Sequence, residues 1–369
     1  MKIFVAALCL FSTIASAALP RFTSQDVFQL NYASNPVVSP DGTFVVYSHN
    51  FMDVMEDRRR SNLWRIDSDG DNARPLTTGA VNDGGVAISP DSKRLAYMSK
   101  DDKGAQVFVR WLDGGETVQV TRLPIAPSGL VWSPDGQWLA FTMFVPVKPP
   151  TMGALAPAPK GAKWADPVTV IDRSFFRLDG AGELPAGFTH VYVVSSNGGA
   201  PRQLTSGNFD HRGSISWAKD GNSLFVTSNR EENAELKPNN SDIFRVSLAG
   251  GEPARITSRF GPDAGVTVSP NGKQIAWVGY DDEILSYQHN RLYVMDIDGG
   301  TPRELLPDLD HSIAGFDWAS DGRGLYIQYD DTGKTQLAYV SLRGKLKEVT
   351  DTMSGLSLSR PYTGASFSV

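Results

Sequence analysis

Short stretches of alternating apolar and polar residues recur along the chain at nearly regular intervals. In each stretch a large apolar residue, here called the anchor, precedes a turn tetrapeptide of the Ser-Pro-Asp-Gly type, and further apolar residues follow the turn two positions apart. A period of two is typical of a β-strand with one face against a core. Proline, aspartate and glycine favour the tight turn that joins two strands. The pattern therefore predicts antiparallel hairpins.

Six of these units line up along the chain. The second residues of their tetrapeptides are 40, 90, 134, 219, 270 and 320, so that four of the five spacings lie between 44 and 51 residues. That spacing is close to the length of one four-stranded propeller blade. Further apolar stretches and Gly-Gly turns after each unit supply a third and a fourth strand. The sequence thus predicts an all-β propeller.

The last residues of the chain resemble the start of another unit. Ser366-Phe367-Ser368-Val369 aligns with Thr267-Val268-Ser269-Pro270. We therefore expect a seven-bladed β-propeller with six full four-stranded blades and the start of a seventh. An unfinished blade exposes strand edges, which proteins normally avoid. We interpret the chain as the front part of a longer protein, and we expect it to associate through this edge, as a possible homo-oligomer.

The irregular sequence is concentrated in one class of connection. An insertion at residues 145–188 lies between the second and third strands of the third unit, and the equivalent loops at 229–240 and 280–290 are also long. In a four-stranded blade these connections share one face with the links between blades. Binding residues are common on loops that a rigid scaffold holds. We expect this face to be the functional one, with tolerated insertions as the alternative.

The N-terminus has the pattern of a signal peptide. Lys2 precedes an apolar stretch, and Ala15-Ser16-Ala17 is a small-residue cleavage site. We assign residues 1–18 to the signal peptide and residues 19–369 to the propeller domain, and we expect a periplasmic or secreted protein. The only cysteine, Cys9, lies in the signal peptide. The mature chain therefore offers no disulfide and no thiolate site.

Composition and spacing exclude several kinds of chemistry. The net charge is −6 and no marked Lys/Arg cluster occurs, so we expect no nucleic acid as partner. No stretch after the signal peptide is long and apolar enough for a membrane helix, so we expect no membrane as partner. No Gly-x-Ser-x-Gly nucleophile motif occurs, and the five histidines are not at metal-ligand spacing. We expect no catalytic residue, no metal and no cofactor in this chain.

Three charged residues on the irregular loops are candidates for substrate binding. Glu231 and Glu232 could hold the free ammonium of a peptide, and Arg177 of the insertion could meet a carboxylate or a carbonyl. The alternative is that all three are exposed loop residues without a ligand.

Several segments together resemble a known family. The blade motifs, Arg177-Leu178-Asp179-Gly180, Asn229-Arg230-Glu231-Glu232-Asn233 and Arg291-Leu292-Tyr293-Val294-Met295-Asp296 are similar to the N-terminal propeller of prolyl-oligopeptidase-family (S9) serine peptidases, in the acylaminoacyl-peptidase and dipeptidyl-peptidase-like branch. The resemblance implies that the propeller limits access of short peptides to a C-terminal α/β-hydrolase domain. That domain, which carries the catalytic triad in the family, is absent from this chain.

Three functions remain open at this point. The first is a substrate-gating propeller of a secreted serine exo- or oligopeptidase, with no peptidase activity of its own. The second is a TolB-like periplasmic propeller that binds a protein partner, because TolB-type propellers share the blade motif. The third is a stand-alone propeller enzyme with a central metal, which would need inward-facing acidic or histidine ligands from several blades; no repeat position supplies them.

Overall fold

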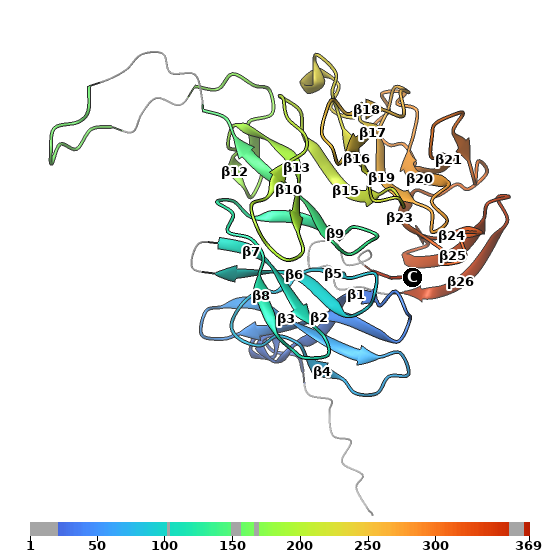
Figure 1. The fold of residues 1–369 in the computed structure, drawn as a ribbon, viewed down its shortest axis with the longest axis horizontal. Helices are drawn as coiled ribbons and strands as arrows, with labels where there is room; N and C mark the ends of the chain where they lie inside the picture. Colours follow the sequence, from blue (N-terminus) through green and yellow to red (C-terminus); the bar gives the residue numbers. More distant parts are fainter. Residues whose placement is uncertain (1–20, 102–103, 149–155, 166–169, 354–364) are drawn as a thin grey trace, which may run out of the picture.

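The repeats form a ring of six four-stranded antiparallel sheets in the computed structural model (Figure 1). The structure describes residues 21–101, 104–148, 156–165, 170–353 and 365–369, so the predicted signal peptide lies outside the described residues. Each sheet is one blade, and the first strand of each blade lies toward the middle of the ring (Figure 1). The prediction of an all-β propeller is confirmed.

The first three blades comprise β1 (Asn31–Val38), β2 (Phe44–Asp53), β3 (Arg58–Asp67), β4 (Arg74–Pro75); β5 (Gly84–Ile88), β6 (Arg94–Asp101), β7 (Gly104–Trp111), β8 (Thr117–Gln119); and β9 (Pro127–Trp132), β10 (Trp138–Pro146), β13 (Gly187–Ser195), β14 (Arg202–Gln203). The last three comprise β15 (His211–Trp217), β16 (Ser223–Ser228), β17 (Asp242–Ser247), β18 (Ala254–Arg255); β19 (Asp263–Val268), β20 (Gln274–Gly279), β21 (Arg291–Asp296), β22 (Arg303–Glu304); and β23 (Ile313–Trp318), β24 (Gly324–Asp331), β25 (Lys334–Ser341), β26 (Leu346–Met353). The remaining elements are the hairpin β11 (Arg177–Leu178) and β12 (Gly182–Glu183) and the 3-10 helices η1 (Ser24–Gln29) and η2 (Ala234–Leu236).

The serine of the turn tetrapeptide closes the first hairpin of a blade. In blade three the Ser133 hydroxyl donates to Asp135 (2.5 Å) and accepts the backbone N–H of Trp138 (2.9 Å). Gly136 has φ of 67°, a conformation that glycine adopts without strain. The same two serine bonds recur in blades one, two and five. The repeated tetrapeptide thus encodes a complete local hydrogen-bonded turn.

A threonine after the fourth strand joins that strand to the third. The Thr121 hydroxyl accepts the backbone N–H of Val107 (2.9 Å) and donates to the Gln106 side chain (3.1 Å). The equivalent backbone bond is made by Thr77, Thr205 and Thr257. Because the fourth strands are as short as two residues in several blades, this side-chain bond extends their attachment.

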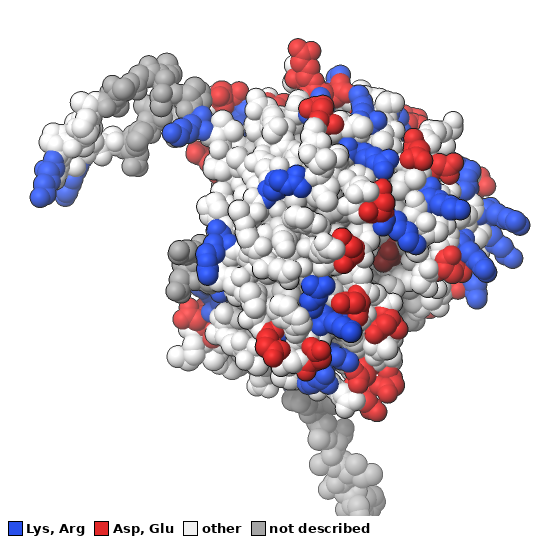
Figure 2. Space-filling model, in the orientation of Figure 1, with Lys and Arg blue, Asp and Glu red and all other residues white. Residues whose placement is uncertain are grey.

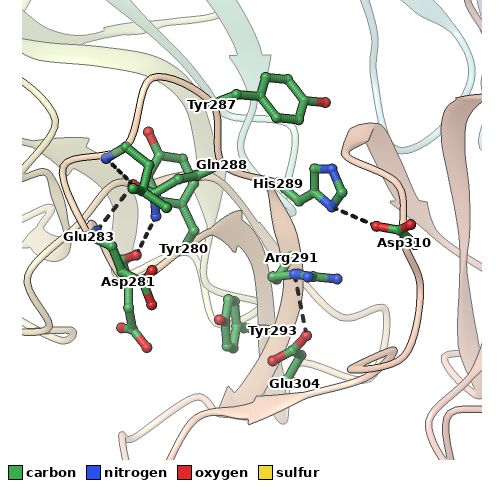
Figure 3. A pocket seen from close by; sticks show the side chains of 11 residues that line it. Tyr280, Asp281, Glu283, Tyr287, Gln288, His289, Arg291, Tyr293, Glu304 and Asp310 are labelled. Atoms are coloured by element: carbon green, nitrogen blue, oxygen red, sulfur yellow. Dashed lines mark hydrogen bonds and ion pairs between the residues drawn. The ribbon is translucent and has the colours of Figure 1, made fainter.

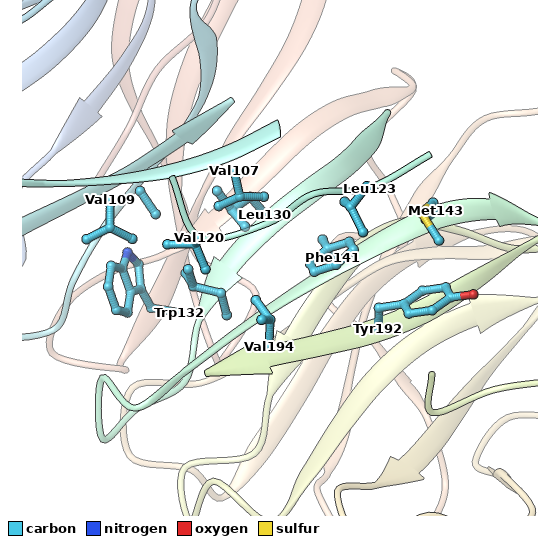
Figure 4. Packing of buried hydrophobic residues seen from close by; sticks show 12 residues of the cluster. Val107, Val109, Val120, Leu123, Leu130, Trp132, Phe141, Met143, Tyr192 and Val194 are labelled. Carbon is cyan, nitrogen blue, oxygen red and sulfur yellow. The ribbon is translucent and has the colours of Figure 1, made fainter. Parts of the chain in front are cut away.

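Apolar side chains pack between neighbouring blades and hold them together. Between blades two and three, Val107 and Val109 of β7 lie in one buried cluster with Trp132 of β9 and Phe141 of β10 (Figure 4). Burial of each such side chain contributes about 1.5–3 kcal/mol. The Trp132 indole N–H also donates to the carbonyl of Ala87 in blade two (2.9 Å). The anchors predicted from the sequence therefore form the contacts between blades.

The described part of the chain holds six blades, so the prediction of a seven-bladed propeller is wrong for these residues. Residues 365–369 form no strand. A strand needs a hydrogen-bonded neighbour along its length, and no segment within the described residues pairs with 365–369 in this way.

These five C-terminal residues lie between blade six and blade one (Figure 1). The backbone N–H of Val38 in blade one donates to the Ser368 hydroxyl (3.1 Å), as that of Val268 donates to Ser216 (2.9 Å) between blades four and five. Ser368 therefore takes the place just before an anchor, which makes Val369 the anchor. The sequence alignment placed Phe367 there, two residues away. Apolar residues alternate with a period of two, so two registers that differ by two residues present the same pattern.

The two faces of the ring differ. We call the side with the first-to-second and third-to-fourth turns the plain face, and the side with the second-to-third loops and the links between blades the loop face. Met55, Leu236, Ile284 and Tyr287 lie on second-to-third loops of the loop face, with 69–88% of their surface exposed. The irregular sequence and the most exposed apolar side chains of the six blades thus share one face.

Candidate functional site

Three loops form a continuous row on the loop face across blades three, four and five. The backbone N–H of Ser174, in the β10–β13 insertion, donates to the Glu235 carboxylate of the β16–β17 loop (2.7 Å). The Asn239 amide of that loop donates to Asp282 of the β20–β21 loop (3.4 Å). Each loop is thereby braced by the next, and the row offers a shared surface to a ligand.

Of the two candidate glutamates, Glu231 is engaged by basic neighbours. Its carboxylate lies 3.4 Å from the Arg255 guanidinium of β18 and 3.5 Å from the Lys237 ammonium. Arg255 lies 24 residues further along the chain, on the outer strand of the same blade, so no local motif indicates that it pairs with Glu231. Glu231 therefore braces its own loop and is not a free carboxylate.

Glu232 and Arg177 are both exposed on the row. Within the described residues, the structure gives neither side chain an ion pair or a hydrogen bond, and it gives no contact between Arg177 and either glutamate. Arg177 lies on β11, whose hairpin partner is β12. The structure thus places the predicted residues on adjacent loops of one face without joining them into a single preformed site.

A buried ion pair lies beneath the β16–β17 loop. The Asp242 side chain is 2% exposed, and its carboxylate lies 2.6 Å from the Arg255 guanidinium. Burial raises the pKa of Asp242 to about 6, although Arg255 opposes this shift. Arg255 therefore forms ion pairs with two carboxylates, those of Asp242 and Glu231.

A second buried carboxylate lies at the start of blade five. Asp263 is 1% exposed, and its carboxylate accepts bonds from the Trp277 indole N–H (2.8 Å) and from Arg259, whose guanidinium approaches to 2.6 Å. Burial raises the pKa of Asp263 as well. Buried charges of this kind need their partners, because an isolated charge in the interior is very costly.

Blade five repeats the Asp242–Arg255 pair with the charges exchanged. Arg291 occupies the position of Asp242 at the start of the third strand, and Glu304 occupies the position of Arg255, 3.8 Å from Arg291. The register supports this equivalence, since Phe244 faces Arg255 as Tyr293 faces Glu304. The same structural position therefore carries opposite charge in adjacent blades.

A hollow of about 430 Å³ opens beside this second pair, between the β20–β21 loop and the segment after β22 (Figure 3). The hollow is open to solvent on one side. Its lining combines aromatic and acidic side chains, namely Tyr280, Asp281, Glu283, Tyr287, His289, Arg291, Tyr293, Glu304 and Asp310, together with Leu285 and Gln288. No sequence motif marked it, because its lining comes from a loop, two strands and the next link between blades.

Two histidines are buried between blades three and four. The rings of His190 and His211 lie 5.5 Å apart, and burial lowers the pKa of His211 to about 4. Because burial lowers the pKa of both side chains, we interpret them as neutral structural residues at neutral pH.

Among the described residues, no three acidic or histidine side chains are grouped closely enough to hold a metal ion. On the face shown in Figure 2, basic and acidic side chains are mixed in the upper right and lower parts, several basic ones gather at the right edge, and the middle and left carry few charges. None of the helices in the described ranges has the length and apolar character needed to cross a bilayer.

Comparisons with known proteins agree with this fold. Residues 167–281, which include most of the loop row, match the family described as the dipeptidyl peptidase IV N-terminal region. Dipeptidyl-peptidase 5 of Porphyromonas gingivalis is 26% identical over 343 residues, covering 89% of this chain and 49% of that protein. The uncharacterized peptidase YuxL of Bacillus subtilis is 27% identical over 342 residues, covering 87% and 50%.

A solved acylaminoacyl peptidase from Pyrococcus horikoshii has the same fold, with a TM-score of 0.68 at 15% identity over 88% of this chain and 47% of that one. The chain thus spans about half the length of the curated relatives it matches. These findings confirm the resemblance drawn from the sequence: the chain is similar to the N-terminal propeller of prolyl-oligopeptidase-family (S9) peptidases.

Proposed function

We propose that this propeller is the substrate-gating domain of an exported serine exo- or oligopeptidase that acts on short peptides. The observation that carries the proposal is the loop row on one face of the ring. The chain enters the first blade on that same face, through η1 and the start of β1. A catalytic domain that docks against this face would be reached by peptides that first pass the loop row.

Within this proposal Glu232 and Arg177 are the residues that contact the peptide. Both are exposed and charged, and they could meet the ammonium and carboxylate groups of a short peptide. Glu231 acts indirectly, because its carboxylate is already paired with Arg255 and Lys237. The export signal at residues 1–18 belongs to the same proposal and predicts a periplasmic or secreted protein.

The proposal is tested by comparing two proteins made from the same gene: this chain, and the longest product of its open reading frame. We expect only the longer product to hydrolyse dipeptidyl or acyl-peptide reporters and to react with a fluorophosphonate probe. Substitution Glu232→Gln or Arg177→Ala in the longer product should raise KM, with Asp69→Asn on the plain face as the matched control.

Two results would contradict the proposal. One is hydrolysis of the reporters by this chain alone. The other is an open reading frame without a hydrolase region, together with a protein partner that co-purifies in fixed stoichiometry; that result would favour a TolB-like binding module.

A further inference from the structure

The hollow of blade five has an excess of negative charge. Its lining holds four carboxylates, those of Asp281, Glu283, Glu304 and Asp310, and one guanidinium, that of Arg291. Arg291 already has partners, because it donates to the carbonyl of Leu309 (2.5 Å) and lies 3.8 Å from the Glu304 carboxylate. Arg259 lies beside Asp281 (3.8 Å) but is held more closely by the buried Asp263, and the His289 imidazole lies 3.8 Å from Asp310.

Aromatic side chains line the same hollow. Tyr280, Tyr287 and Tyr293 contribute rings, and His289 meets the Tyr287 ring edge-on with 5.2 Å between ring centres (Figure 3). The face of an aromatic ring attracts a cation. The structure contains one example at this place, since the Arg259 guanidinium lies 4.1 Å from the centre of the Tyr293 ring. Tyr287 is 69% exposed and is therefore accessible to a ligand.

The loop that forms one wall is internally braced. The Gln288 amide oxygen accepts the backbone N–H groups of Glu283 (3.1 Å) and Leu285 (3.3 Å), and its amide nitrogen donates to the carbonyl of Asp281 (2.7 Å). The wall is thus held in place before any ligand arrives, which lowers the entropic cost of binding.

Blade four provides an internal comparison. At the equivalent position Arg255 and Lys237 neutralise Asp242 and Glu231. In blade five the equivalent pair, Arg291 and Glu304, has the opposite charges, and further carboxylates and tyrosines lie around it. The negative charge and the aromatic surface coincide in blade five.

We propose that the blade-five hollow binds an organic cation, namely the ammonium or guanidinium head of a basic side chain in a short peptide. Carboxylates balance the charge, and the Tyr287 ring covers the apolar stem. The hollow is separate from Glu232 and Arg177. That the cation belongs to a peptide rests on the proposed function. That the hollow prefers a cation rests only on the residues that line it.

The test measures binding to the purified chain at low salt with three probes: N-acetyl-lysine amide, its uncharged counterpart N-acetyl-norleucine amide, and free 1,5-diaminopentane. We expect the lysine amide to bind at least about tenfold more tightly than the norleucine amide, because each of several charge contacts should lower the dissociation constant about fivefold. Glu283→Gln should weaken lysine-amide binding about fivefold and Tyr287→Ala about threefold. Both residues are exposed, so the variants should fold, and Asp69→Asn on the plain face should bind like wild type.

Equal binding of the lysine and norleucine amides would overturn the proposal, as would an equal loss in Asp69→Asn. Binding of the diamine without the lysine amide would overturn the assignment to peptides. Because no hydrolysis is measured, lysine-amide binding would stand even if the longer gene product proved to have no peptidase activity.

Discussion

The plain face and the loop face are built from the same repeat by different kinds of interaction. On the plain face, contacts within a few residues complete each turn: the Ser39 hydroxyl donates to Asp41 and accepts the N–H of Phe44. On the loop face the important partners are far apart in sequence, as with Glu231 and Arg255. The repeat therefore fixes one face locally and leaves the other free to differ from blade to blade.

The turn aspartate Asp41 and the buried aspartates Asp242 and Asp263 differ in the direction of their pKa shifts. Hydrogen bonds from Ser39 and Thr43 lower the pKa of Asp41 in a plain-face turn to about 2. Burial raises the pKa of Asp242 and Asp263 beneath the loop face. Hydrogen bonds thus favour the charged form of the Asp41 carboxylate, whereas burial opposes the charged form of Asp242 and Asp263, which depend on their arginine partners. The predictions below test this difference.

The largest expected effect is on the loop face. Asp263→Ala removes the closest partner of Arg259 and the acceptor of the Trp277 indole N–H, so that the guanidinium keeps the more distant Asp281 (3.8 Å) and the Pro262 carbonyl (3.4 Å) while the buried indole N–H loses its acceptor. We expect the free energy of unfolding to fall by about 3–5 kcal/mol, measured by urea denaturation at pH 7. Asp220→Ala, which removes one backbone bond from an exposed plain-face turn, should cost about 1 kcal/mol or less. Equal losses would contradict the comparison.

The second prediction concerns pH and Asp242. Its folded pKa of about 6 lies above the value of 3.8 for a free side chain, so its contribution to stability is present below about pH 4 and is lost as the pH rises through 6. Between pH 4 and pH 7 the ionisation of Asp242 should lower the free energy of unfolding by up to about 3 kcal/mol. Unfolding curves of wild type and Asp242→Asn should diverge over this range; parallel pH profiles would disprove the assignment.

Asp41 provides the opposite case on the plain face. Because its pKa is lowered to about 2, its contribution is present above pH 4 and is lost as the pH falls toward 2. Asp41→Asn should therefore reduce acid sensitivity below pH 4 and leave the profile above pH 5 unchanged.

A smaller effect is expected for the turn serine. Ser133 is fully buried, and Ser133→Ala removes an acceptor for the Trp138 N–H and a donor to Asp135. The expected loss is about 1–2 kcal/mol in urea denaturation. Ser247→Ala, which removes one exposed bond to the N–H of Ala249, is the matched control and should lose less than about 0.5 kcal/mol. Similar losses would show that the turn does not depend on the tetrapeptide serine.

The smallest effect on stability is expected for the proposed peptide contacts. Glu232→Gln and Arg177→Ala should each change the free energy of unfolding by less than about 0.5 kcal/mol, because both side chains are exposed. The same variants should weaken the binding of a short peptide to the chain. A stability loss above 1 kcal/mol would indicate a structural role for these residues.

Local patterns in the sequence were sufficient to predict much of the fold. The anchors and the tetrapeptides located the blades, because turn chemistry and the two-residue period act over short distances. The same period misplaced the anchor near the C-terminus by two residues, at Phe367 instead of Val369, since both registers alternate alike. The partner of Glu231 and the blade-five hollow were missed for a different reason: each depends on side chains from separate strands that only the folded ring brings together.

The central claim is that short peptides bind to the loop face. The most direct test is photo-cross-linking of a short peptide that carries a diazirine to the purified chain, followed by mapping of the modified residues. We expect modification within residues 170–186, 229–241 and 280–290, and competition by unlabelled peptide. Modification concentrated in the plain-face turns, or labelling that unlabelled peptide does not reduce, would contradict it.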